Sequence, residues 1–166
     1  MDSESNEDVE KVFRWLGEGG RVAKVAKALR DAIDYVLDDP HTGRYEISQL
    51  DKSETIIIGL KIKHFIVREL KLKHIRLRGQ LDTIIEKVAI DIIFSHTTNW
   101  MIPMQAVGEV CLLVSANDRA STFDLGVFHA REKSLTQGGN QDKKRSLTSD
   151  ARENRVRWVK RSEPLP

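Results

Sequence analysis

The stretch VAIDIIFSHTTNWMIP, residues 88–103, decides how the fold of this chain is interpreted. Its first half is an apolar run rich in β-branched residues, which predicts a strand that is covered on both faces of a sheet. Asp91 nevertheless lies in the middle of that run. Because an unpaired carboxylate is costly to bury, something elsewhere in the chain must compensate for its charge.

A second β-type run, residues 81–85, precedes this stretch, and Glu86 and Lys87 are the polar pair between the two runs. A hairpin turn at that pair places Asp82 and Asp91 directly opposite each other on one face, with their Cβ atoms roughly 5 Å apart. Like charges at this spacing repel unless one carboxyl is protonated, a cation lies nearby, or a divalent metal such as Mg²⁺ bridges them. From the residues alone, a metal site and an exposed or salt-bridged pair remain equally open.

The pattern of apolar residues in the rest of the chain predicts a mixed α/β domain. An amphipathic helix is expected over residues 21–37. Residues 54–72 are ambiguous, because TIIIG could open as a strand whereas the later spacing favours a helix from about Gly59 onward. Further strands are expected over residues 110–116, 121–130 and 155–159.

Composition and charge describe an ordinary globular chain. The 166 residues are 40% hydrophobic and 31% charged, and the net charge of only +2 does not by itself announce a polyanion partner. The chain shows neither a signal peptide nor an apolar run long enough to span a bilayer, so a cytoplasmic protein without membrane contact is expected. The single cysteine, Cys111, cannot form an internal disulfide and is expected to be a core residue.

The two aspartates, followed by NWMIP, AVGEVCLLVSAND and GGNQDKKRSL, resemble the catalytic domain of the NaeI-type restriction endonucleases of the PD-(D/E)XK nuclease superfamily. The similarity runs over about residues 55–158. It implies a restriction-endonuclease-like α/β fold, with a central mixed β-sheet flanked by α-helices. Residues 11–160 are expected to form a single nuclease-like domain between a disordered acidic leader, residues 1–10, and a tail, residues 161–166.

The resemblance further implies Mg²⁺-dependent hydrolysis of double-stranded DNA by a homodimer, in a system that includes a cognate methyltransferase. Asp82 and Asp91 match the metal-binding aspartates of the family. Ile93 stands where the family has its catalytic lysine, and Lys63 stands where an additional glutamate is expected. Either Lys63 has taken over the lost lysine's role or the site is inactive. The two replacements favour impaired or absent catalysis, whereas the family favours a type II site-specific deoxyribonuclease.

The segment GGNQDKKRS, residues 138–146, is the candidate DNA-binding loop. Its glycines let the backbone approach an anion, and Asn140, Lys143, Lys144 and Arg145 could contact phosphates. A solvated basic loop is the plain alternative, but the family resemblance favours DNA contacts. A second basic segment, residues 71–78, is equally consistent with a phosphate contact and with an ordinary surface loop.

The main functional hypothesis is therefore a type II restriction endonuclease-like protein that binds duplex DNA. The rival is a catalytically inactive DNA-binding or assembly subunit derived from such a nuclease. The chain ends soon after Trp158, so we expect it to lack the second, DNA-binding domain attached in the best-known member of the family.

Overall fold

A computed structural model of the chain describes residues 2–37, 52–74, 81–117, 119–137 and 144–166. Its longer helices are α1 (Asp2–Leu16), α2 (Arg21–Leu37) and α4 (Lys52–Glu69), followed late in the chain by the short α5 (Ser149–Asn154). Two 3₁₀ turns, η2 (Met104–Ala106) and η3 (Glu132–Ser134), interrupt the strands. None of the described helices is long and apolar enough to cross a lipid bilayer.

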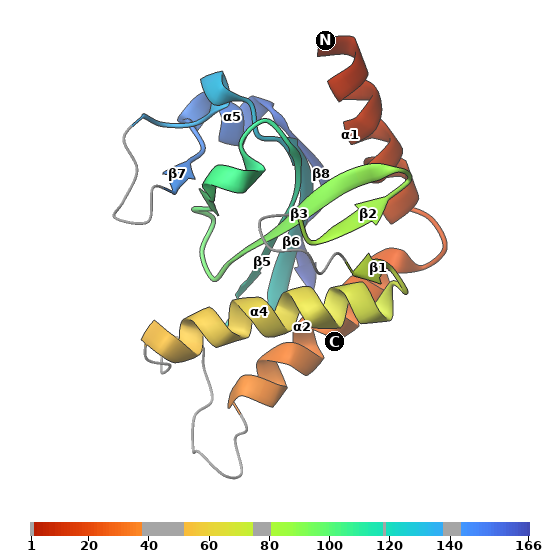
Figure 1. The fold of residues 1–166 in the computed structure, drawn as a ribbon. Helices are drawn as coiled ribbons and strands as arrows, with labels where there is room; N and C mark the ends of the chain where they lie inside the picture. The colour runs from red at the N-terminus through yellow and green to blue at the C-terminus, as the bar shows by residue number, and fades with distance from the viewer. Residues whose placement is uncertain (1, 38–51, 75–80, 118, 138–143) are drawn as a thin grey trace.

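The described strands form two sheets (Figure 1). The larger sheet has six strands in the order β1-β2-β3-β5-β6-β8, and the smaller one pairs β4 with β7. β3 and β5 are parallel, whereas the other neighbours in the larger sheet are antiparallel, so the sheet is mixed. The strands are β1 (Lys73–His74), β2 (Thr83–Ile85), β3 (Val88–Ser95), β4 (Met101–Ile102), β5 (Val110–Asn117), β6 (Thr122–His129), β7 (Arg145–Ser146) and β8 (Val156–Pro164).

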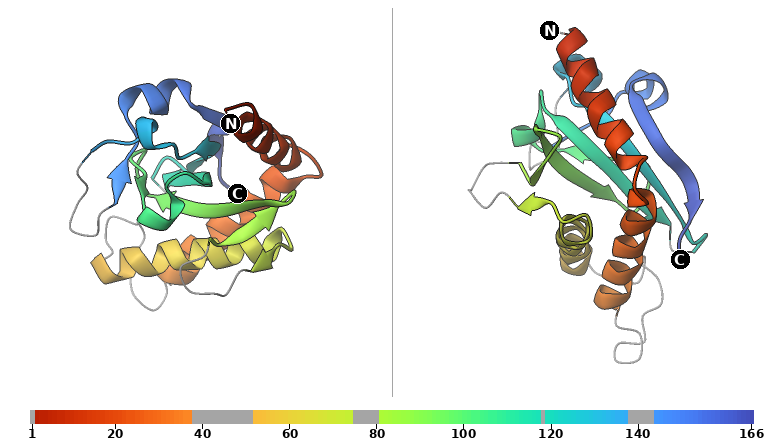
Figure 2. Two further views of the ribbon diagram at one scale, coloured as in Figure 1. Left: turned by 45° about the horizontal axis from the view of Figure 1, so that its top comes forward. Right: turned by 90° about the vertical axis from the view of Figure 1, so that its right-hand side faces the viewer.

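Alternation along the central strands separates two apolar clusters. Ile90 and Ile92 of β3 pack in the larger cluster, to which α1, α2 and α4 contribute their buried faces. Figure 2 shows these helices arranged against the sheet. Ile93 packs in the smaller cluster, with buried side chains from β4, β5, η2 and α5. The observed mixed sheet flanked by helices confirms the restriction-endonuclease-like α/β fold expected from the sequence.

Helix α4 resolves the ambiguous segment. Ile58, Ile62 and Ile66 recur every four residues and are fully buried, so the apolar stripe is that of a helix from its start. The strand-like appearance of TIIIG came from Ile56 and Ile57, which are exposed on the other side of the same helix.

The predicted hairpin lies where the sequence placed it. Glu86 and Lys87 both adopt positive φ, 52° and 67°, which suits the two-residue turn that matches the twist of paired strands. Ile85 pairs with Val88, and Ile84 with Ala89. This register continues outward to the two aspartates.

Both ends of the chain differ from the expected leader and tail. Residues 2–10 belong to helix α1, whose Val12 and Leu16 are fully buried. Residues 161–164 extend β8 along β6, and the Leu165 backbone N–H donates to the Ser121 carbonyl at 2.7 Å. Where the sequence suggested a disordered leader and a tail, the structure has a helix at one end and a continued strand at the other.

Candidate active site

Asp82 and Asp91 meet at the open end of the hairpin. Thr83 pairs with Ile90, so Asp82, one residue before β2, lies beside Asp91 of β3. The backbone N–H of Ile92 donates to Asp82 Oδ2 at 2.8 Å, which holds this carboxylate against β3. The arrangement brings two acidic groups to one point of the sheet, as the hairpin register predicts.

Burial sets the charge state of Asp91. The residue is only 2% exposed, and its Oδ2 is buried without a hydrogen-bond partner among the described residues. Burial, followed by the hydrogen bond and the charge of the neighbouring Asp82 carboxyl, raises the pKa of Asp91 from 3.8 to about 7. The charge of Lys63 and a backbone hydrogen bond from Asp82 oppose this rise. Near neutral pH the Asp82–Asp91 pair therefore readily holds an extra proton.

Lys63 approaches the same pair from helix α4. Its Nζ lies 3.4 Å from Asp82 Oδ2, and both side chains are partly exposed. The neighbouring Ile62 is buried in the larger core, and this fixes the rotation of α4 from which Lys63 projects. The cation therefore offsets part of the negative charge at the site.

Ile93 lies on the same face of β3 as Asp91 and is 6% exposed. It packs with Trp100 and Leu113 in the smaller core and also lines the adjoining cleft. The position that carries a lysine in the family resemblance is therefore apolar here. A cationic group at this site must come from another element, and within the described part of the chain Lys63 of α4 approaches Asp82.

The donor set of the two aspartates fits Mg²⁺ bound through few protein ligands. Asp91 Oδ2 is a buried oxygen with no described partner, and the Asp82 carboxylate lies next to it. Mg²⁺ commonly uses one or two carboxylates and completes its shell with waters and substrate phosphates. No cluster of three or more acidic, histidine or cysteine ligands occurs within the described residues. A Mg²⁺ ion held by this pair would therefore need water or substrate oxygens as its further ligands.

A cleft of about 500 Å³ opens between helix α4 and residues 95–103; Ile92 and Ile93, which follow Asp91 in β3, line it, but neither aspartate does. Lys63 and Ile93 line it together with Ser95, His96, Asn99 and Lys144. The Thr97 backbone N–H donates to Ser95 Oγ at 3.1 Å, and the Asn99 N–H donates to Thr97 Oγ1 at 3.1 Å. These bonds hold the polar wall of the cleft in a defined shape.

The polar wall was not singled out from the sequence. The available signal was the change from apolar residues to SHTTN where β3 ends, since binding groups are often carried on loops at strand ends. The hydrogen bonds that make this segment a wall join residues only two to four positions apart.

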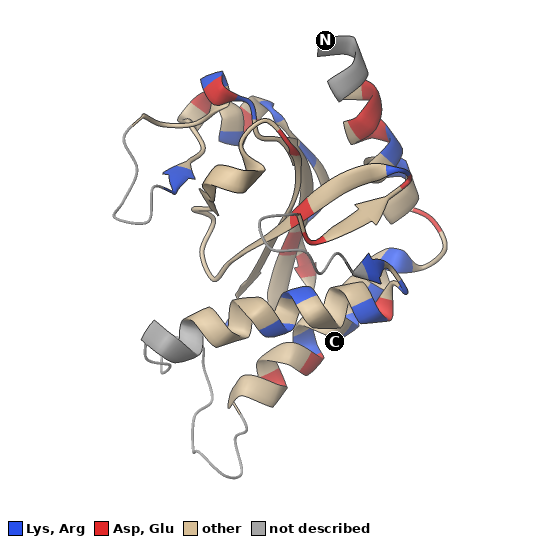
Figure 3. Cartoon of the chain, viewed as in Figure 1, with Lys and Arg blue, Asp and Glu red and all other residues tan. Residues whose placement is uncertain are grey.

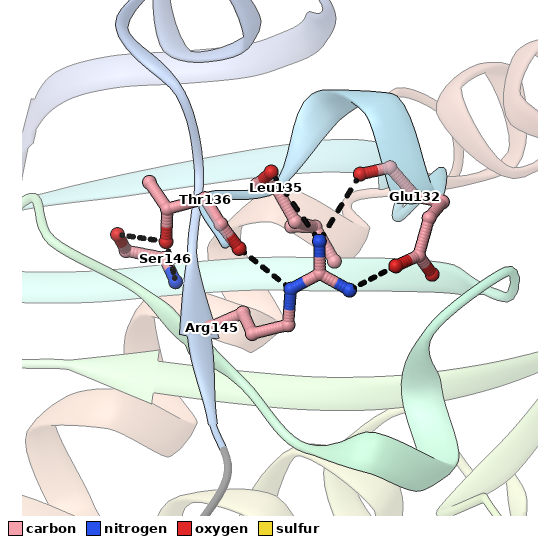
Figure 4. Close-up of polar contacts among 5 residues, drawn as sticks. All are labelled: Glu132, Leu135, Thr136, Arg145 and Ser146. Carbon is pink, nitrogen blue, oxygen red and sulfur yellow. Dashed lines mark hydrogen bonds and ion pairs between the residues drawn. The ribbon is translucent and has the colours of Figure 1, made fainter. Parts of the chain in front are cut away.

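The candidate DNA-binding residues separate into three groups. Asn140 and Lys143 lie outside the described residues. Lys144 is exposed and lines the cleft. Arg145 points elsewhere: its guanidinium group contacts Glu132, Leu135 and Thr136 (Figure 4).

Basic residues also recur along α4 and at β1, whereas acidic residues occur in β3 and directly before β2 (Figure 3). Of the second basic segment, Lys71 and Lys73 are described and exposed, and residues 75–80 lie outside the described part.

Comparison with known proteins gives two matches. A family described as "Restriction endonuclease NaeI" matches residues 10–166. The type II restriction enzyme NaeI of Lentzea aerocolonigenes is 30% identical over 155 residues, which are 90% of this chain. The same alignment covers 47% of that enzyme, so the chain spans about half the length of this relative. The chain belongs to the NaeI restriction endonuclease family.

Proposed function

We propose that this chain binds duplex DNA in the cleft beside helix α4 and hydrolyses a phosphodiester bond with Mg²⁺ held by Asp82 and Asp91. The observation that carries the proposal is the position of Lys63 Nζ, 3.4 Å from Asp82 Oδ2, where the charge of Lys63 also acts on the neighbouring Asp91. A cation at this place can supply the charge and the hydrogen-bond donors that the apolar Ile93 cannot.

Each residue has a defined task in this mechanism. Bound Mg²⁺ would polarise the scissile phosphate and lower the pKa of a coordinated water. Asp82 is held by the Ile92 N–H in the orientation needed for ligation, and Asp91 contributes its buried oxygen after it loses its proton. Lys63 has three N–H donors with which to orient the attacking water and stabilise charge on the phosphate.

A second candidate function is DNA binding or assembly without cleavage. Two features favour it: Lys63 already pairs with Asp82, and Ile93 is built into an apolar core. In that case Lys63 neutralises the aspartates and makes metal binding unnecessary. The two functions predict different results for the loss of Lys63: in the first it reduces cleavage, and in the second there is no cleavage to lose.

A nicking assay on supercoiled plasmid, with Mg²⁺ or Mn²⁺, tests the proposed cleavage. We expect wild-type activity to be lost in Asp82→Ala and Asp91→Ala, and Lys63→Ala to reduce it about 100-fold or more. Lys61→Ala is the matched control, because Lys61 lies on the same helix but over the Tyr35 ring. Binding of DNA without nicking by the wild type, at any tested metal concentration, would establish the second function instead.

The variant Ile93→Lys separates the two cationic positions. If Lys63 supplies the catalytic cation, Ile93→Lys leaves activity unchanged or lowers it, because a charge enters an apolar core. If the site is merely deprived of its lysine, Ile93→Lys raises nicking by an inactive wild type. The double variant Lys63→Ala, Ile93→Lys then shows whether one position can replace the other.

The family also supports a wider setting for this activity. We propose that the protein acts in the cytoplasm as a homodimer, in a restriction–modification system whose methyltransferase protects the same DNA sequence from cleavage. Two copies of the site are needed to cut both strands of a duplex in one binding event. Sedimentation of the protein with and without duplex DNA tests the dimer, and a monomer in both conditions would contradict it.

A further inference from the structure

Arg145 begins the short strand β7 and turns its side chain toward the η3 segment (Figure 4). Its Nε donates to the Thr136 carbonyl at 2.6 Å, and Nη1 donates to the Glu132 carboxylate. Nη2 makes two longer contacts, to the Glu132 carbonyl at 3.4 Å and the Leu135 carbonyl at 3.5 Å. Since a guanidinium has five N–H donors, most of its hydrogen-bonding capacity is used inside the protein.

Arg145 and its carboxylate partner Glu132 differ in burial. The Arg145 side chain is 17% exposed, whereas that of Glu132 is 73% exposed. An ion pair to so exposed a carboxylate contributes little, because water and salt screen it. The contacts to backbone carbonyls are therefore the more important ones, and they require the planar fork of arginine.

Backbone hydrogen bonds also join β7 to the residues that follow η3. The Thr136 N–H donates to the Ser146 carbonyl at 2.8 Å, and the Thr148 N–H donates to the Ser134 carbonyl at 3.0 Å. On its other side β7 pairs with β4, where Arg145 lies opposite Ile102. Strand β7 is thus held between the η3 segment and β4.

The residue before this anchored strand is Lys144, which lines the cleft beside Lys63 and Ile93. Its position follows directly from the position of β7, since one peptide unit separates the two residues. Arg145 and Lys144 are both basic in the sequence, but their side chains meet different surroundings: one contacts backbone carbonyls and the other reaches the cleft.

We propose that Arg145 is a positioning residue, which anchors β7 to the η3 segment and so holds Lys144 in the cleft for contact with a DNA phosphate. Arg145 itself makes no DNA contact. The inference rests on the proposed DNA binding for its functional part, while the anchoring can be measured without DNA. It assigns opposite roles to two adjacent cations that the sequence groups together.

Substitution by lysine discriminates between anchoring and phosphate contact. Arg145→Lys keeps the positive charge but cannot reproduce the fork that reaches the backbone carbonyls. If Arg145 anchors β7, the Lys variant behaves like Arg145→Ala; if it contacts phosphate, the Lys variant behaves like the wild type. Glu132→Ala gives an independent check, because freeing a DNA-binding arginine from its carboxylate would strengthen DNA binding.

The DNA measurement is fluorescence anisotropy of a mixed-sequence duplex in EDTA, over a series of KCl concentrations. We expect Lys144→Ala, Arg145→Ala and Arg145→Lys each to weaken binding about three- to tenfold and to lower the salt slope by about one phosphate contact. The double variant Lys144→Ala, Arg145→Ala should match the single variants. A double variant that loses twice the slope, or a Glu132→Ala variant that binds more tightly, would overturn the inference.

The second measurement is hydrogen exchange of the backbone N–H groups of Thr136, Ser146 and Thr148 in the free protein. Arg145→Lys should speed their exchange about tenfold or more, because the hydrogen bonds around β7 open more often. Arg30→Lys is the matched control, since Arg30 pairs with Asp34 on the exposed surface of α2. Unchanged exchange in Arg145→Lys would refute the anchoring. A wild type that binds no duplex would refute the proposed function and leave the exchange result to judge the anchor.

Discussion

A buried carboxyl such as Asp91 lowers the free energy of unfolding when it is ionised, because its charge is removed from water. Its pKa is raised to about 7 by burial and by the adjacent Asp82 carboxyl. In the unfolded chain an ordinary aspartate ionises near 3.9. The folded state therefore binds a proton over this interval that the unfolded state has already lost, and the stability contributed by Asp91 falls as the pH rises from about 4 through about 7.

We therefore expect Asp91→Asn to stabilise the metal-free protein at pH 8, by about 2–4 kcal/mol, because the neutral amide avoids this cost. The gain should shrink at pH 5 and vanish near pH 4, where the folded and unfolded wild type are both protonated at this residue. Urea unfolding at the three pH values measures it. Asp34→Asn, on an exposed position of α2, should change little at any pH. Equal effects of Asp91→Asn at pH 4 and pH 8 would contradict the assigned charge state.

Metal binding should reverse the same penalty. Saturating Mg²⁺ at pH 8 is expected to raise the Tm of the wild type by about 3–8 °C, because the ion binds only the folded arrangement of Asp82 and Asp91. Asp91→Asn should lose most of this shift, and removal of the ion with EDTA should restore the original Tm. Differential scanning calorimetry measures both effects. The absence of any shift in the wild type would show that the pair does not hold Mg²⁺.

At the scale of elements, local chemistry made the hairpin predictable. Glu86-Lys87 was the only polar pair between two apolar runs. Because side chains alternate between the two faces of a strand, a shift of one residue would move the apolar side chains to the opposite face, and this left one register that buries these side chains. The contact of Lys63 with Asp82 joins residues 19 positions apart on different elements, so no local pattern could show it; the family resemblance suggested it instead. The contact of Arg145 with Glu132 could not be predicted for a similar reason, because the two residues lie 13 positions apart and the sequence shows only a basic cluster.

The packing of β6 against β8 depends on the absence of a side chain at Gly126. A Cβ atom there would lie 2.7 Å from Val156 Cγ1 and 2.8 Å from Trp158 Cε3, which is closer than carbon atoms pack. Trp158 in turn lies 5.6 Å from the buried Trp100 ring, whose Nε1 donates to the Val114 carbonyl. The close approach of β8 to β6 at Gly126 thus positions Val156 and Trp158 against the smaller core, which also contains Ile93.

Gly126→Ala is expected to destabilise the fold by about 1–3 kcal/mol, because the added methyl forces Val156 and Trp158 to move. Trp158→Leu in the same background should recover part of the loss by making room for the methyl. Gly108→Ala serves as a comparison of a different kind, since its cost comes from a φ of +87° and not from a clash. Thermal unfolding of the variants distinguishes them: relief by Trp158→Leu is expected for Gly126→Ala only.

At the scale of the whole molecule, the first helix contacts the last strand. Glu10 of α1 accepts a hydrogen bond from Arg157 Nε of β8 at 2.7 Å, and the same guanidinium lies 3.9 Å from the centre of the Phe13 ring. These residues are more than 140 positions apart in the sequence, so composition alone made both ends look peripheral. The acidic start hides an amphipathic helix, and the end continues a strand of the sheet.

A chain trimmed to residues 11–160 should therefore be markedly less stable than the full chain. Trimming shortens α1 to less than two turns around Val12 and Leu16, and it removes the part of β8 that pairs with Thr122 and Phe123. The removed residues include the buried Leu165 and the partly buried Val9, and losing a large buried side chain costs about 2–5 kcal/mol, so we expect the Tm to fall by about 10 °C or more. Arg157→Ala alone, which removes an exposed ion pair, should lower the free energy of unfolding by about 1 kcal/mol or less. If the trimmed chain unfolds at the temperature of the full chain, residues 2–10 and 161–166 contribute nothing to the fold, and the boundaries suggested by the sequence alone are the correct ones.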